Sequence, residues 1–209
     1  SSGDSINNSN HELLTSQISL TRQFHHIDNI PALTNAERIR CKPIPTEGFG
    51  VKLPEEAINA LEQTDLAVRF AFGFIKGDSL TAPTHGVLTF HHGNIESYRG
   101  KPAGFWEFMN SESEVGITLQ RITETLDGGE VVASKSLNIP RDATWQDIER
   151  LVFNESDDML VTAVNNITDQ SASPDKVDEL GPVYTNPTLL TLARYLIKNN
   201  AIKLRRCLQ

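Results

Sequence analysis

The sequence predicts an α/β fold, and three segments support this prediction. Residues 53–63, LPEEAINALEQ, place a proline and two glutamates in the first turn of an amphipathic segment, which is typical of a helix. Residues 64–75, TDLAVRFAFGFI, are almost continuously apolar, as in a strand that is buried on both faces. Residues 85–92, HGVLTFHH, repeat that pattern after a short link. A helix followed by two such strands favours a sheet packed against helices.

The next segments extend this sheet. Residues 101–112, KPAGFWEFMNSE, predict a short helix with a proline in its first turn. Residues 114–123, EVGITLQRIT, alternate apolar and polar side chains, as a half-buried strand does. Residues 130–140, EVVASKSLNIP, predict a further strand, and LDGGE between the two predicts a tight turn. We therefore expect these two strands to form an antiparallel pair.

Two more helices are predicted toward the C-terminus. Residues 144–168 predict one long helix, with Thr144 as its cap and Asp147 three residues later. Residues 186–200 predict the last helix, capped by an asparagine that a proline follows. The basic run IKLRRCLQ, residues 202–209, is interpreted as a solvated tail, and a phosphate or membrane-surface contact is the alternative.

The composition limits the classes of function. The chain has 209 residues and a formal net charge of −8, which disfavours non-specific binding to nucleic acid. It has no apolar run of the roughly 20 residues that cross a bilayer, and its first residues do not resemble a signal peptide. Its two cysteines, Cys41 and Cys207, are expected to be free thiols in a reducing compartment. We therefore expect a cytoplasmic protein without a membrane partner.

The pattern divides the chain into three parts. Residues 1–40 are polar and weakly patterned, and they predict a tail and a connector. Residues 41–170 hold the predicted α/β domain, and residues 171–209 hold a loop and a helix.

The most informative stretch is LTFHHGNIESYRG, residues 88–100, in which a strand ends on two histidines. A lone histidine at a strand end is more often a structural cap than a catalytic group. Adjacent histidines in a strand point to opposite faces, so we expect no metal site here. The sequence has no glycine-rich dinucleotide motif, no P-loop and no nucleophile elbow.

Three quoted segments together resemble the formyltransferase family that uses 10-formyltetrahydrofolate. They are TFHHGNIESYRG, PAGFWEFMNSESEVGITLQRI and ETLDGGEVV, residues 89–100, 102–122 and 124–132. Their order and spacing match the family, which includes methionyl-tRNA, glycinamide ribonucleotide and sugar-nucleotide N-formyltransferases. The resemblance covers the middle third to half of the chain.

This resemblance implies a Rossmann-like fold with a mostly parallel twisted sheet, helices on both faces and an antiparallel hairpin. Family members begin with a strand–helix–strand unit, which the first 40 residues do not resemble. We expect the chain to lack that unit. Either a homodimer contact or a missing N-terminal segment is then expected to cover the exposed sheet edge.

The resemblance also assigns roles to residues. His91 matches the family histidine, and Asp127 matches the family aspartate. A protonated histidine and an asparagine amide would stabilise the oxyanion, and the aspartate would accept a proton from the attacking amine. The co-substrate would be 10-formyltetrahydrofolate, without a metal. Its pocket would involve residues that the bare sequence also allows as core or turn: Phe72, Gly73, Phe74, Ile75, Leu126 and Gly128.

The chain departs from the family at position 89, which holds Thr89 where the family has asparagine. His92 stands where the family usually has proline. Three explanations are open for Thr89: it donates through a water, Asn94 takes over the role, or the protein no longer catalyses formyl transfer. Losing one oxyanion donor costs about 10²–10³ in rate.

We therefore expect formyl transfer to the primary amine of a small molecule, with a nucleotide-linked amino sugar as the first candidate. Methionyl-tRNA is disfavoured by the acidic charge and by a C-terminal segment that does not resemble a β-barrel. The alternatives are a hydrolase of the same co-substrate and a catalytically degenerate interaction protein.

Overall fold

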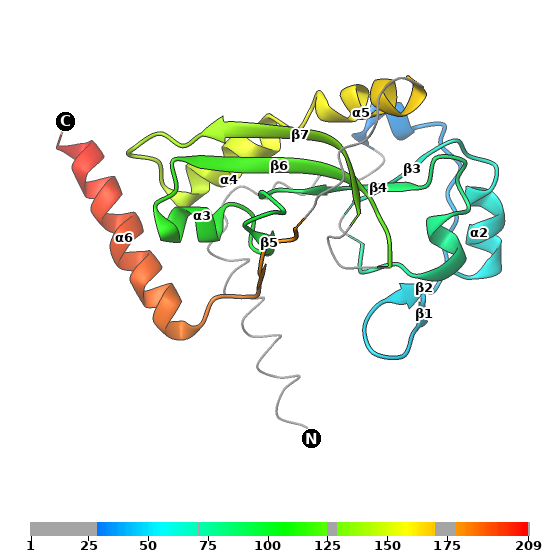
Figure 1. The fold of residues 1–209 in the computed structure, drawn as a ribbon, viewed down its shortest axis with the longest axis horizontal. Helices are drawn as coiled ribbons and strands as arrows, with labels where there is room; N and C mark the ends of the chain where they lie inside the picture. The colour runs from blue at the N-terminus through cyan, green and yellow to red at the C-terminus, as the bar shows by residue number, and fades with distance from the viewer. Residues whose placement is uncertain (1–28, 71, 125–128, 170–178, 209) are drawn as a thin grey trace.

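A computed structural model describes residues 29–70, 72–124, 129–169 and 179–208 (Figure 1). Its centre is a four-stranded sheet in the order β3-β4-β6-β7. The strands are β3 (Ala67–Arg69), β4 (Val87–His91), β6 (Glu114–Arg121) and β7 (Glu130–Asn138). β3 and β4 are parallel, whereas β6 is antiparallel to both β4 and β7.

The predicted α/β class and the predicted antiparallel pair β6–β7 are confirmed. The described sheet is mixed rather than mostly parallel, since only β3 and β4 run in the same direction. The reason lies in the connections. A parallel pair needs a crossover of a dozen or more residues, and only residues 122–129 join β6 to β7.

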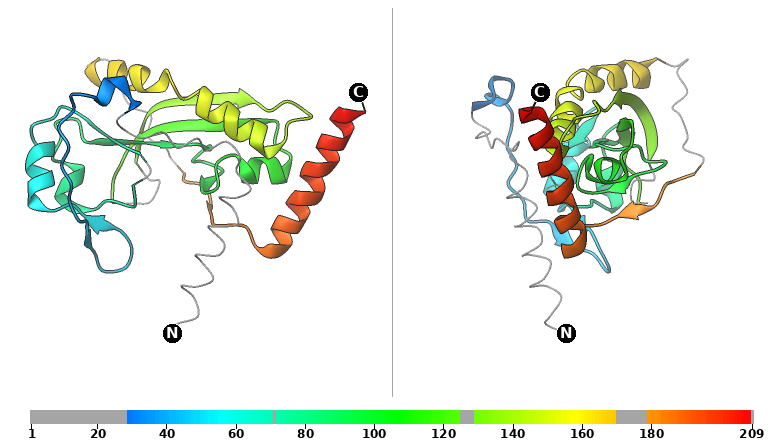
Figure 2. Two further views of the ribbon diagram at one scale, coloured as in Figure 1. Left: turned by 180° about the vertical axis from the view of Figure 1, so that it is seen from behind. Right: turned by 90° about the vertical axis from the view of Figure 1, so that its left-hand side faces the viewer.

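The larger core lies between one face of the sheet and two helices, α4 (Trp145–Asn154) and α5 (Met159–Thr168). Figure 2 shows both helices running along the two long strands. Val115, Ile117 and Leu119 alternate along β6 and are at most 1% exposed. Burying side chains of this size stabilises the fold by about 1.5–3 kcal/mol each. This alternation fixes which face of β6 is left for other contacts.

A second, smaller core lies at the other end of the sheet. It joins Ile75 and Leu80 to Val87 and Ile122, and it involves the 3-10 helix η3 (Gly77–Leu80). Next to η3 lie α2 (Glu55–Leu61) and the antiparallel pair β1 (Ile44–Pro45) and β2 (Val51–Lys52). We expected helices on both faces of the sheet; only α4 and α5 cover a face of the long strands β6 and β7 in the described ranges.

The remaining elements are short, apart from the last helix. They are η2 (Pro31–Leu33), β5 (Arg99–Gly100), β8 (Val183–Tyr184) and α3 (Phe105–Asn110), followed by α6 (Leu189–Cys207). β5 and β8 form a parallel pair that brings residues 183–184 beside the segment after β4.

The strand predicted over residues 64–75 is much shorter in the structure, where β3 ends at Arg69. Its guanidinium contacts side chains and backbone beyond the strand, and Phe70 is 65% exposed. An apolar run in the sequence therefore does not by itself predict how far a strand extends or which of its side chains are buried.

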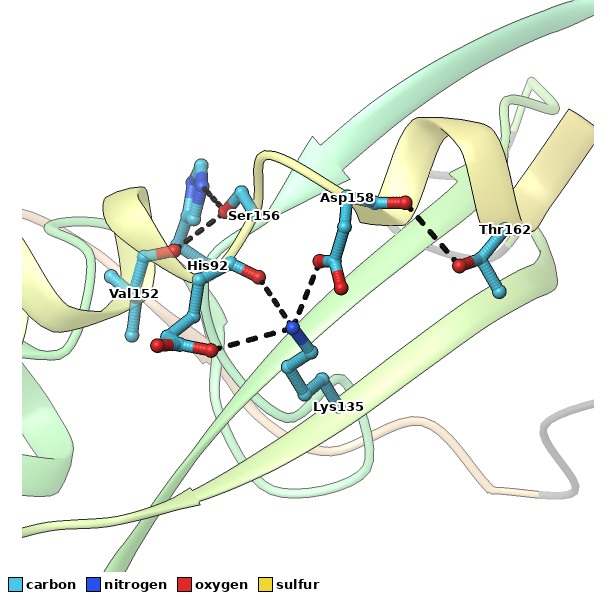
Figure 3. Close-up of polar contacts among 7 residues, drawn as sticks. His92, Lys135, Val152, Ser156, Asp158 and Thr162 are labelled. Atoms are coloured by element: carbon cyan, nitrogen blue, oxygen red, sulfur yellow. Dashed lines mark hydrogen bonds and ion pairs between the residues drawn. The ribbon is translucent and has the colours of Figure 1, made fainter.

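The single helix predicted over residues 144–168 is two helices. Lys135 of β7 contacts the junction, where its Nζ lies 2.9 Å from both the Glu155 carbonyl oxygen and Asp158 Oδ1 (Figure 3). This ammonium stabilises carbonyl and carboxylate oxygens at the end of α4, so the chain can start a new helix. The predicted cap is confirmed, since Thr144 and Asp147 form a capping box.

The predicted last helix is confirmed, but its limits differ. Its cap is Thr188 rather than the predicted asparagine, and α6 continues to Cys207. The basic run is therefore the end of this helix rather than a separate tail, although its residues from Lys203 to Leu208 are exposed to solvent. Arg206 pairs with Asp142 at 3.3 Å and Asp147 at 2.8 Å, which joins the end of α6 to the start of α4.

Cys41 and Cys207 are both free thiols. Among the described helices, none combines the length and the apolar character needed to cross a membrane.

Tyr195 should be the main anchor of α6. It is 1% exposed, its ring packs against Phe105 and Trp145, and its hydroxyl accepts a hydrogen bond from Gln146 Nε2 at 2.7 Å. Tyr195→Ala should lower the free energy of unfolding by about 3–5 kcal/mol, and Tyr195→Phe by about 1 kcal/mol. Urea denaturation measures both, and equal effects would contradict this packing role.

Candidate active site

Thr89 and His91 lie on the same face of β4. Their register partners on β6 are Gln120 and Thr118, which point to the face that α4 and α5 do not cover. Thr89 is 5% exposed and His91 is 8% exposed. The structure therefore brings together the two motif positions that the sequence singled out on β4.

Arg69 is the group that contacts Thr89. Its Nε and Nη2 donate to Thr89 Oγ1 at 3.2 and 3.0 Å, and its Nη1 donates to the Gly73 carbonyl oxygen at 3.1 Å. The guanidinium thus joins the motif strand to the predicted co-substrate loop. Arg69 had no predicted role, although a charged residue within an apolar run is a visible signal.

His91 is oriented by a backbone carbonyl. Its Nε2 lies 2.7 Å from the carbonyl oxygen of Tyr98. Because a carbonyl oxygen can only accept, Nε2 carries a hydrogen, and Nδ1 is the nitrogen left for other partners. The hydrogen bond also fixes the segment 92–98 over the end of β4.

His92 points to the opposite face and has a structural role. Its ring packs against Phe90 and Phe153, and its Nε2 donates to Ser156 Oγ at 3.0 Å, while that hydroxyl donates to the Val152 carbonyl (Figure 3). Burial, together with the nearby His91, lowers the pKa of His92 to about 4. His92 is therefore neutral at physiological pH, and it ties the motif to α4.

Asn94 lies away from Thr89. A side chain on Gly116 would come within 2.8 Å of the Asn94 backbone, so Asn94 sits directly on Gly116 of β6. Gly116 is four residues from Gln120, the partner of Thr89, or about 13 Å along the strand. Asn94 Oδ1 accepts a hydrogen bond from the Glu96 amide at 2.9 Å. The structure does not bring Asn94 and Thr89 together.

The predicted co-substrate loop is only partly buried. Phe72 is 40% exposed, and a Cβ on Gly73 would meet no atom within 4 Å. Phe74 packs against Phe49 with ring centroids 5.0 Å apart, whereas Ile75 is 6% exposed and belongs to the smaller core. The other predicted positions, Leu126, Asp127 and Gly128, lie outside the described residues.

A polar groove of about 530 Å³ lies beside this motif. Its floor is formed by small or hydroxyl-bearing residues of the long strands: Gly116, Thr118, Ser134 and Ser136. Its walls carry four glutamates and two tyrosines: Glu96, Glu107, Glu112, Glu114, Tyr98 and Tyr184. We call this the acidic groove.

Glu107 of α3 is the buried member of this set. It is 3% exposed, and its Oε1 has no hydrogen-bond partner among the described atoms. A Cβ on Gly93 would lie 3.3 Å from Glu107 Oε1 and 2.9 Å from His91 Nε2, so both groups approach the same point. Burial, with a smaller contribution from Glu112, raises the pKa of Glu107 to about 7.

Glu107 was not among the predicted site residues. Its signal was an acidic residue within the apolar helical segment GFWEFM. No cluster of three or more histidine, cysteine, aspartate or glutamate side chains arranged for a metal ion occurs in the described ranges.

The raised pKa of Glu107 predicts a pH-dependent cost in stability. A carboxyl with a folded-state pKa above its unfolded value binds more protons when folded, so its ionisation destabilises the fold as pH rises. The stability of Glu107→Gln relative to the wild type should increase by about 1–3 kcal/mol between about pH 4 and pH 8. Urea denaturation at both pH values measures this change, and a constant difference would contradict it.

Comparison with known proteins places this site in a family. The formyl transferase family model matches residues 50–164, which is more than half of the chain. A methionyl-tRNA formyltransferase of Clostridium acetobutylicum is 28% identical over 127 residues, which cover 59% of this chain and 41% of the relative. The chain thus spans about two fifths of that relative's length.

Solved structures share the fold at low identity. HypX from Aquifex aeolicus, crystallised with tetrahydrofolic acid, has a TM-score of 0.54 and 20% identity, over 68% of this chain and 27% of its own. The formyltransferase PseJ from Anoxybacillus kamchatkensis, crystallised with tetrahydrofolate and UDP-4,6-dideoxy-4-formamido-L-AltNAc, has a TM-score of 0.52 and 16% identity, over 66% and 71% of the two chains.

The family match includes β3, β4, β6 and β7, and with them Arg69, Thr89, His91 and Glu107. On this match, the chain belongs to the formyl transferase family.

Proposed function

We propose that this protein transfers a formyl group from 10-formyltetrahydrofolate to the primary amine of a small molecule. The observation that carries the proposal is the set of hydrogen bonds by which Arg69 is held on Thr89, on the same face of the sheet as His91. This set places donors beside the motif position at which the family asparagine is missing.

Formyl transfer to an amine develops negative charge on the formyl oxygen. Donors aimed at that oxygen stabilise the transition state by about 3–4 kcal/mol each where measured. Thr89 Oγ1 accepts two hydrogen bonds from Arg69, so we assign it the role of an anchor for the guanidinium. Arg69 and the Nδ1–H of a protonated His91, whose Nε2–H is held by the Tyr98 carbonyl, then act as the oxyanion donors. This assignment differs from the three explanations that the sequence left open for Thr89.

The residues after β3 fit a flat heterocyclic co-substrate. Phe70 and Phe72 present exposed rings, and Gly73 leaves open space next to the carbonyl that Arg69 contacts. When bound there, 10-formyltetrahydrofolate supplies the activated formyl group. Asp127 retains the role that the family resemblance implies, as a proton acceptor near His91.

The relatives support this activity without deciding the acceptor. The methionyl-tRNA formyltransferases match over less than half of their length, so their tRNA substrate is not carried over to this chain. PseJ was crystallised with a formamido sugar nucleotide, which makes an amino sugar a reasonable class of acceptor. The net charge of −8 disfavours an RNA acceptor. A cytoplasmic enzyme of one-carbon metabolism fits these properties.

Binding of the stable analogue 5-formyltetrahydrofolate should be measured first, by isothermal titration calorimetry on the full chain. We expect micromolar binding, weakened by Asp127→Ala. Absence of binding to a protein that circular dichroism shows to be folded would favour the degenerate interaction protein. Release of formate without any amine would favour the hydrolase.

Arg69→Met should lower the rate of formyl transfer on the order of 10²–10³-fold at saturating 10-formyltetrahydrofolate, a condition that separates this effect from any loss of co-substrate affinity when the Gly73 carbonyl is released. Arg69→Lys should recover only part of the rate, because an ammonium lacks the planar fork of the guanidinium. Single-turnover kinetics with an accepted amine measures both effects.

A second substitution separates this role from a structural one. Thr89→Asn in the Arg69→Met background restores an amide donor at position 89, so it should recover part of the rate. An Arg69→Met variant that keeps the wild-type rate would refute the assignment of Arg69 as an oxyanion donor.

A further inference from the structure

We propose that the acidic groove is the acceptor site, that it selects a cationic primary amine without a phosphate group, and that the Glu107 carboxylate takes the proton from this amine. The inference rests on the proposed function, and it narrows the class of acceptor. It disfavours the nucleotide-linked amino sugar that the sequence suggested.

The acidic groove lies next to His91 and the segment that follows it. Tyr98 lines the groove, and its backbone carbonyl accepts the hydrogen bond from His91 Nε2. Glu107 also lines the groove, and its Oε1 shares the space at Gly93 with His91 Nε2, at 3.3 and 2.9 Å from a Cβ placed there. An amine next to Glu107 would therefore lie beside the histidine at which the formyl group is transferred.

The charge of the groove is almost entirely negative. Within the described part of the chain, none of its four glutamates forms an ion pair with a lysine or arginine. Tyr98 donates to Glu112 at 2.6 Å, and Ser136 donates to Glu114 at 2.7 Å, but these partners are neutral. Lys135 borders the groove, yet its Nζ contacts Glu155 and Asp158 at the α4–α5 junction (Figure 3).

The negative electrostatic field of the groove distinguishes between acceptors by their charge. Two unit charges about 4 Å apart near a protein surface interact by several kcal/mol, which favours an ammonium and opposes a phosphate. Glu107 lines the groove and its buried Oε1 has no hydrogen-bond partner among the described atoms, so this carboxyl can accept a hydrogen bond inside the field. A buried carboxylate without a partner is costly, and an ammonium that donates to it removes that cost.

The aromatic wall also suits a cation. Tyr98 and Tyr184 stack with ring centroids 5.3 Å apart, and Trp106 lies 4.9 Å from Tyr184. Burial and the hydrogen bond to Glu112 raise the pKa of Tyr98 to about 12, so this wall is neutral. Aromatic faces attract ammonium groups by about 0.5–2 kcal/mol.

Glu107 also answers a chemical requirement. An ammonium has no lone pair, so it must lose a proton before its nitrogen can attack the formyl carbon. In the proposed step, R–NH₃⁺ and the Glu107 carboxylate give R–NH₂ and the Glu107 carboxylic acid. When the new C–N bond forms and the donor C–N bond breaks, the second proton of the amine is accepted by Asp127, in the role proposed above, and passes to the leaving nitrogen. A buried carboxylate is a stronger base than an exposed one.

The test compares D-glucosamine with D-glucosamine 6-phosphate, two amines that differ by one phosphate. Each is titrated into the ¹⁵N-labelled full chain at neutral pH, without folate, and the amide shifts of the groove residues Gly116, Ser134 and Ser136 are followed. We expect glucosamine to shift these amides and to bind on the order of tenfold more tightly than its phosphate.

Two isosteric variants control the experiment. Glu107→Gln should weaken glucosamine binding on the order of tenfold, and Glu56→Gln on exposed α2 should leave it within about twofold. If neither amine shifts the groove amides, or if the phosphate binds as tightly as glucosamine, the proposal is overturned. If Glu107→Gln binds glucosamine like the wild type, Glu107 is not the contact and the proposal also fails.

A separate titration with 5-formyltetrahydrofolate distinguishes this inference from the proposed function. If 5-formyltetrahydrofolate binds but neither amine shifts the groove amides, the acceptor site is refuted and the formyltransferase proposal stays intact. Amine binding without folate binding would refute the formyl-transfer activity and keep the groove as a site for cationic amines.

Discussion

The alternation of side chains along β6 is the constraint on which the rest of the structure depends. Val115, Ile117 and Leu119 bury one face of the strand against α4 and α5. Gly116, Thr118 and Gln120 are thereby placed on the other face, beside the motif strand β4. A shift of one residue in register would exchange the two faces and remove both the core and the site. The same alternation of side chains along β6 therefore builds the core and positions the candidate site.

The site that results has opposite charges on its two sides. Arg69 lies at the end of β3 and carries a positive charge next to Thr89, whereas Glu107 lies on α3 and approaches His91 from the other direction. His91 lies two residues after Thr89 on the same face of β4, and its Nε2 and Glu107 Oε1 approach the same point at Gly93. In the proposed reaction, an acceptor nitrogen that must lose a proton and a formyl oxygen that gains negative charge would thus face groups of the suitable sign.

Much of the fold could be predicted from the periodicity of apolar residues, because this periodicity reflects which side chains are buried. The alternation over residues 114–123 and the Thr144 cap were local signals, and both gave the correct element. The break after α4 was missed because Lys135, which contacts it, comes from another strand. The extent of β3 was missed because composition alone does not show where a chain leaves the sheet.

The candidate site was harder to predict than the fold, because its residues meet only through tertiary contacts that local sequence patterns do not show. His91 was found because its motif is contiguous, whereas Arg69 and Thr89 are 20 residues apart and meet only through parallel strand pairing. Glu107 could not be told from a surface glutamate of a short helix, since its burial depends on the segments packed around it. Tertiary contacts thus bring together the residues for which roles are proposed, and residue type alone does not show this.

The segment over the acidic groove is positioned mainly by its backbone. Thr118 Oγ1 donates to the Gly93 carbonyl, the Asn94 backbone lies on Gly116, and Gly181 donates its amide to the Ile95 carbonyl. Any Cβ on these three glycines would approach a neighbour to within 2.8 Å or less. The outward side chains of Glu96 and Ser97 take no part in this framework. Evolution or a protein engineer can therefore vary the specificity of the groove at those two positions while the scaffold that holds them stays unchanged.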